Sequence, residues 1–136
     1  EERGLLERTL VIIASEFGRD VVTEGSPDKT VGDQAINMAD FIIELRQYGM
    51  HRHYTETNSV LLFGGGFKKG FVYGKTADEH PCRIVENPVT IEDLHATIYR
   101  ALGIPPDLAY VIENRPFHVT KDGKGKPVEE LFGRRT

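Results

Sequence analysis

The sequence predicts an α/β fold with a mostly parallel sheet flanked by helices. Two continuous apolar runs, residues 9–15 and 59–63, contain no regular alternation of polar residues, and such runs are typical of parallel strands buried on both faces. Two segments with helical periodicity, residues 34–48 and 90–102, would supply helices that pack over this sheet. A length of 136 residues fits a single domain.

The first predicted strand ends at a group of residues suited to a functional site. Thr9–Ser15 leads directly into Glu16-Phe17-Gly18-Arg19, and α/β proteins bind ligands at the carboxyl ends of their strands. An acid, a glycine that lets the chain turn and an arginine therefore stand where site chemistry is expected. A solvated Glu16–Arg19 pair at a strand exit explains the same pattern.

The segment after the loop of residues 20–33 predicts a broad amphipathic helix. Asp33 is placed as its N-cap and Gly49 as its stop. The apolar surface of residues 34–48 is too wide for a helix covered on one side only. We expect it to pack over the sheet or against another subunit, which would make the protein a homo-oligomer.

The second half of the chain contains the best-defined helix. Thr90 and Asp93 form a capping box, and Gly103 ends the helix. The buried face is expected to consist of Ile91, Leu94, Ile98, Ala101 and Leu102. The run 59–63 is closed by Gly64-Gly65-Gly66, and further short extended or helical segments are expected at residues 71–75, 82–85, 115–120 and 127–132.

Composition excludes some classes of function. A formal charge of −4 argues against a general nucleic-acid-binding or anionic-membrane surface. No apolar run approaches the roughly 20 residues that span a bilayer. The single cysteine, Cys82, has no internal disulfide partner, so the redox compartment stays open. Because Glu1 is neither an initiator methionine nor part of a signal pattern, we expect a fragment whose N-terminal remainder precedes it.

Two motifs permit a functional and a structural interpretation. Residues 64–70 lack the spacing of a nucleotide-binding loop, so a tight turn is favoured over a phosphate cradle. His51 and His53 would share one face of an extended segment and could bind a metal together. His-x-His alone is a weak signal, because zinc sites normally use three or four protein ligands.

Five blocks of sequence, taken in order, resemble one known family. The chain resembles the C-terminal part of a large bacterial family of uncharacterised sulfatase-like proteins, grouped with the alkaline phosphatase and sulfatase superfamily. The blocks are TLVIIASEFGR (9–19), HRHY (51–54), SVLLFGGG (59–66), NPVTIEDLHATIYRALG (87–103) and RPF (115–117) with GKPVEELF (125–132).

The resemblance implies that this chain is the C-terminal portion of an alkaline phosphatase-like fold. It also implies metal-dependent hydrolysis of a phosphoester or sulfoester, with the nucleophile and several metal ligands before residue 1. Glu16-Phe17 occupies the place of an Asp-His ligand pair, and His53 resembles a later histidine ligand. The divalent metal would be zinc or calcium. The parent protein would be exported or periplasmic.

Two functions follow from these observations. In the first, Glu16 and His53 bind the metal, while Arg19 binds the anionic group of a small-molecule or glycan ester. In the second, the chain is a non-catalytic descendant that binds an anionic glycan or an envelope partner. Phe17, which cannot bind a metal, and Arg52, which stands where relatives of this family commonly have an acid, argue against the usual two-metal centre. Either one metal remains, or the site has become a binding pocket without hydrolysis.

Overall fold

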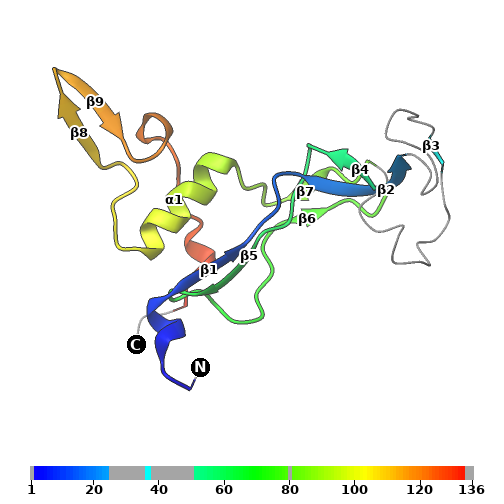
Figure 1. Ribbon diagram of the computed structural model, residues 1–136, viewed down its shortest axis with the longest axis horizontal. Coiled ribbons are helices and arrows are strands. Elements are labelled where there is room, and N and C mark those ends of the chain that lie inside the picture. The colour runs from blue at the N-terminus through cyan, green and yellow to red at the C-terminus, as the bar shows by residue number, and fades with distance from the viewer. Residues whose placement is uncertain (1, 25–35, 38–50, 80, 134–136) are drawn as a thin grey trace. The chain divides into compact units, whose positions relative to one another are not determined.

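The computed structural model describes residues 2–24, 36–37, 51–79 and 81–133. The chain forms two compact units, made of residues 1–13, 61–76 and 84–136 (unit 1) and of residues 14–60 and 77–83 (unit 2). In chain order the elements are η1 (Leu5–Arg8), β1 (Leu10–Ile13), β2 (Gly18–Glu24), β3 (Ile36–Asn37), β4 (His51–Tyr54), β5 (Leu61–Gly64), β6 (Lys75–Thr76), β7 (Ile84–Glu86), α1 (Ile91–Ala101), β8 (Ala109–Ile112), β9 (Arg115–His118), η3 (Lys121–Gly123) and η4 (Glu129–Leu131), where η is a 3₁₀ turn (Figure 1).

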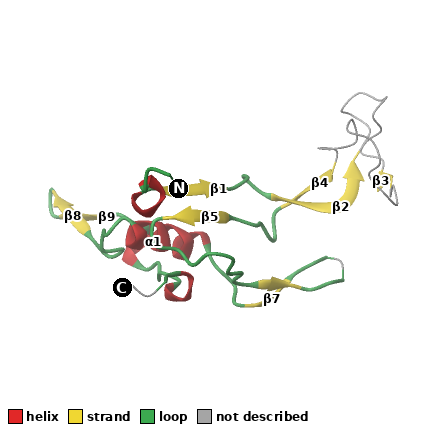
Figure 2. Cartoon of the chain, turned by 90° about the horizontal axis from the view of Figure 1, so that it is seen from below, coloured by secondary structure: helices red, strands yellow, loops and turns green. Residues whose placement is uncertain are grey.

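The prediction of a buried parallel sheet is wrong. The two apolar runs do pair as neighbours, but β1 and β5 are antiparallel, with Leu10 opposite Gly64 and Ile13 opposite Leu61 (Figure 2). Their side chains are also largely accessible, since Ile13 is 56% and Leu61 55% exposed. An apolar run predicts a strand without fixing its direction. Here the chain returns along β1 in the opposite sense after residues 14–60.

All strand pairs among the described residues are antiparallel. β2 lies between β3 and β4, β6 pairs with β7, and β8 pairs with β9. The last pair is a two-residue hairpin whose turn residues, Glu113 and Asn114, have φ angles of 48° and 61°. Positive φ at both positions is the geometry that matches the natural twist of such hairpins. These pairs do not form an alkaline phosphatase-like parallel sheet flanked by helices.

The helix predicted for residues 34–48 falls mostly outside the described residues. Ile36 and Asn37, which are described, form strand β3 and pair with Glu24 and Thr23 of β2. At these two positions the helical prediction is therefore wrong. The expected contact of this helix with the sheet or with another subunit lies outside the described residues.

The helix predicted for residues 90–102 is confirmed as α1. The Asp93 N–H donates to Thr90 Oγ1 at 3.1 Å, which is the predicted cap, and Gly103 follows the helix with φ +76°. The predicted buried face is only partly correct, because Ile91 and Leu102 are each 59% exposed. No helix within the described ranges is long and apolar enough to cross a membrane.

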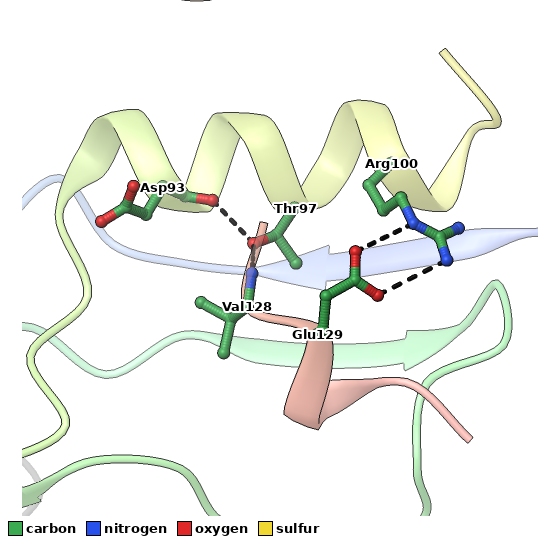
Figure 3. Close-up of polar contacts among 5 residues, drawn as sticks. All are labelled: Asp93, Thr97, Arg100, Val128 and Glu129. Atoms are coloured by element: carbon green, nitrogen blue, oxygen red, sulfur yellow. Dashed lines mark hydrogen bonds and ion pairs between the residues drawn. The ribbon is translucent and has the colours of Figure 1, made fainter. Parts of the chain in front are cut away.

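The fully buried side of α1 is covered by residues 125–132, here called the C-terminal strap. Thr97 is completely buried; its Oγ1 accepts the Val128 N–H at 3.0 Å and donates to the Asp93 carbonyl at 2.6 Å (Figure 3). One turn further on, Arg100 binds both carboxylate oxygens of Glu129, at 3.1 and 3.4 Å. A Cβ on Gly125 would lie 2.3 Å from the Glu92 carbonyl oxygen, so glycine allows the strap to approach the helix.

We expect Thr97→Val to destabilise unit 1 although it preserves the shape of the side chain. The Val128 N–H would lose its acceptor in a buried position, at a cost of about 1–3 kcal/mol. Urea unfolding followed by circular dichroism measures this loss. The matched control is Thr76→Val on exposed β6, which should change the free energy of unfolding by less than about 0.5 kcal/mol; equal effects of the two variants would contradict the role of the hydroxyl.

The Asp93 carboxylate makes strap attachment dependent on pH. The Lys126 main-chain N–H, which donates to Asp93 Oδ1 at 2.7 Å, holds the pKa of this carboxyl below its ordinary value of 3.8, and hydrogen bonds with Thr90 add to the effect. A depressed pKa stabilises the fold above the unfolded-state value, and this stabilisation disappears as the pH falls through the folded-state pKa.

The Asp93→Asn variant should therefore be less stable than the unsubstituted chain at pH 7. The two free energies of unfolding should converge below the ordinary carboxyl pKa. Urea unfolding of both proteins across this range of pH gives the comparison. A difference in unfolding free energy that stays constant down to full protonation would disagree with this account.

Candidate functional site

Strands β2 and β4 bring together two of the three residues predicted for the site. Arg19 lies directly opposite His53, and Gly18 lies opposite Tyr54 in the same antiparallel ladder. Arg19 and His53 are both exposed. Side chains directly opposite in such a ladder have Cβ atoms about 4.5–5.5 Å apart. A cation and an imidazole from distant parts of the sequence thus share one small area of surface.

The aromatic ring of Phe17 packs against both members of this pair. Its ring centroid lies 4.2 Å from that of His53, with the ring planes inclined by 40°, and the Arg19 guanidinium lies 5.4 Å from the Phe17 centroid. Cation–π contacts at exposed sites contribute about 0.5–1 kcal/mol. The three side chains therefore form a contiguous group, here called the Arg19–His53 site. From the sequence alone, Phe17 is identified only as a residue that cannot bind a metal.

The third predicted residue, Glu16, is an exposed side chain in the turn before Phe17. Among the described residues, no three His, Cys, Asp or Glu side chains lie close enough together to hold a metal ion. Zinc normally requires three or four protein ligands, whereas Glu16 and His53 would supply two. The described residues therefore do not fit a complete metal centre on their own.

Loop 77–83 is attached to β4 immediately beside His53. Tyr54 is 8% exposed, and its hydroxyl donates to the Pro81 carbonyl. The loop is closed by a hydrogen bond from the Ala77 N–H to the Arg83 carbonyl at 2.8 Å, and Arg83 pairs with Glu56 at 3.3 Å. These contacts anchor the end of β4 that carries His53.

Two polar side chains that no sequence motif indicates, Ser15 and Asn58, hold the turn before β2. Asn58 Nδ2 donates to the Ser15 carbonyl at 2.6 Å. The Ser15 hydroxyl lies 2.8 Å from the Phe17 carbonyl oxygen and 3.1 Å from Asn58 Oδ1. An antiparallel arrangement of the two apolar runs would have indicated this contact, because it places Ser15 and Asn58 at the same end of the pair.

The glycine run 64–66 forms the expected tight turn in unit 1. All three residues have positive φ, and the Phe67 N–H donates to the Gly64 carbonyl at 3.0 Å. Arg100 and Phe132 border a small pocket next to this turn. None of the three residues predicted for the site lines that pocket.

Comparison with known proteins gives one assignment. The sequence profile of the family described as "Protein of unknown function (DUF1501)" matches residues 1–132. The chain belongs to the DUF1501 family. Neither a curated protein nor a solved structure matches this DUF1501 chain significantly.

Gly18 of this DUF1501 protein should not tolerate a side chain. A Cβ at this position would lie 2.1 Å from the Thr57 carbonyl oxygen, so Gly18→Ala requires a backbone shift in the ladder that aligns Arg19 with His53. Overpacking of this kind typically costs about 1–3 kcal/mol, and we expect faster amide hydrogen exchange in β4.

Gly133→Ala is the matched control, because the nearest atom to its new Cβ would be an ordinary 3.7 Å away. We expect this variant to leave hydrogen exchange in β4 unchanged. Unchanged exchange in Gly18→Ala as well would contradict the proposed close contact.

Proposed function

We propose that this DUF1501 chain recognises an anionic ester group through Arg19 and His53, as part of a phosphoester or sulfoester hydrolase. The observation that carries the proposal is the position of Arg19 directly opposite His53 in the β2–β4 ladder. Arginine can bind two oxygens of a phosphate or sulfate at once. An imidazole N–H beside it can donate to a third oxygen.

Phe17 supports binding of an anion at this position. The ring lies against both polar side chains, which are themselves exposed to solvent. The ring also favours one placement of the guanidinium, which reduces the conformational entropy lost on binding.

Hydrolysis is supported by the sulfatase-like sequence blocks, not by the geometry of the described residues. Under this proposal the nucleophile and further metal donors belong to chain that precedes Glu1, in an exported or periplasmic parent protein. Glu16 and His53 would contribute to a zinc or calcium centre only together with those donors. The role assigned to the present residues is to bind and orient the anionic group.

A non-catalytic function is the second candidate. It is favoured by the aromatic ring of Phe17 against His53, a position at which hydrolases of the superfamily would carry a ligand. In this case the same Arg19–His53 site would bind an anionic glycan or an acidic envelope partner without cleaving it.

Arg19→Gln should weaken binding of a sugar phosphate or sugar sulfate by roughly 10- to 100-fold, because hydrogen bonds to charged groups are worth about 1.5–3 kcal/mol. Arg19→Lys should fall between the parent and Arg19→Gln, since it retains the charge but not the bidentate geometry. NMR titration of the His53 ring resonances measures the affinity. The control is Arg115→Gln on exposed β9, and equal losses in both arginine variants would indicate unspecific charge attraction.

Turnover then separates the two functions. Hydrolysis of 4-nitrophenyl phosphate or sulfate by the longer protein that this proposal assumes, lost on addition of a chelator and on Arg19→Gln, would support the hydrolase. Binding without turnover by that longer protein in the presence of zinc and calcium would support the non-catalytic function.

A further inference from the structure

We infer that Asn58 is a positioning residue for the Arg19–His53 site. Its effect on ligand binding rests on the proposed function, whereas its effect on the geometry of the site does not. Asn58 is separated from Ser15 by 43 positions, yet its amide nitrogen donates to the Ser15 carbonyl, and its amide oxygen lies within hydrogen-bond distance of the Ser15 hydroxyl. The amide nitrogen is thus bonded to Ser15, and the amide oxygen faces the hydroxyl of the same residue.

The turn that Asn58 holds carries Phe17. The Ser15 hydroxyl has a single proton, for which the carbonyl oxygens of Phe17 and of the Asn58 side chain are both acceptors. The chain beside Asn58 also lies close to the first residue of β2, because the Thr57 carbonyl oxygen would be only 2.1 Å from a Cβ on Gly18. Residues 57 and 58 therefore fix the chain on both sides of Phe17.

The strand ladder alone does not fix the position of Phe17. Pairing between β2 and β4 begins at Gly18 opposite Tyr54, and the register shifts after the Arg19–His53 pair. The regular ladder at the site is therefore only two residue pairs long, and Phe17 precedes it. Contacts outside the ladder must place the aromatic ring against His53, and the hydrogen bonds of Asn58 and Ser15 are placed to do so.

The test uses the His53 ring as a reporter of its contact with Phe17. The aromatic ring current of Phe17 shifts the His53 ring proton resonances in the parent, and Phe17→Leu gives their positions without that ring. We expect Asn58→Ala to move the resonances at least half of the way to the Phe17→Leu positions. Anion affinity should fall about fivefold, the equivalent of one neutral hydrogen bond.

Three further variants sharpen the test. Asn58→Asp retains an acceptor but loses the donor to the Ser15 carbonyl, and it should behave like Asn58→Ala. Ser15→Ala removes only the hydroxyl and should give a smaller shift, which tests the inference even if Asn58→Ala does not fold. Ser59→Ala, the matched control at an adjacent exposed side chain, should leave the His53 resonances unchanged.

The outcomes distinguish the two proposals. His53 resonances that stay at their parent positions in both Asn58→Ala and Ser15→Ala would overturn the positioning role, whatever the affinities. If the His53 resonances are displaced in these variants but the unsubstituted chain binds no anion, the positioning role is supported and the proposed function is rejected. Unchanged amide resonances of α1 confirm that unit 1 is intact in each variant.

Discussion

The buried hydroxyl of Thr97 is the contact on which the rest of unit 1 depends most. It satisfies the Val128 N–H and in turn donates to the Asp93 carbonyl. Among the described residues of unit 1, Ala96 and Val128 are the buried hydrophobic side chains. Because this apolar core is small, specific polar bonds, and not burial alone, select the path of the C-terminal strap over α1. A valine at position 97 would fill the space but leave the strap without that bond.

Unit 2 uses the same kind of contact. Tyr54 donates to a main-chain carbonyl in loop 77–83, and Asn58 donates to a main-chain carbonyl in the turn before β2. In each case a side chain pairs with a main-chain group distant in sequence. The Tyr54 bond is costly to lose because Tyr54 is buried, whereas the exposed Asn58 bond acts by restricting the path of the chain.

The sequence predicts α1 well and the sheet poorly, for one physical reason. The cap at Thr90 and the stop at Gly103 are local signals, because the chemistry that ends a helix lies within a few residues of its ends. The direction of β1 relative to β5 depends on the path of the intervening residues, about which five consecutive apolar side chains carry no information. A parallel pair would place Ser15 and Asn58 at opposite ends, so their contact can be predicted only once the antiparallel direction is known.

The candidate site was predictable to a similar extent. The nearness of Arg19 to His53 was expected from the resemblance, whereas the cross-strand register that produces it could not be predicted. Phe17 cannot bind a metal, yet its ring contacts both side chains. A metal centre would attract an anion by its own charge and would need further donors around His53. An arginine and an imidazole that pack against an aromatic ring can bind an anion through directed hydrogen bonds. The affinity for the anion then depends on how firmly the Phe17 ring is held in place.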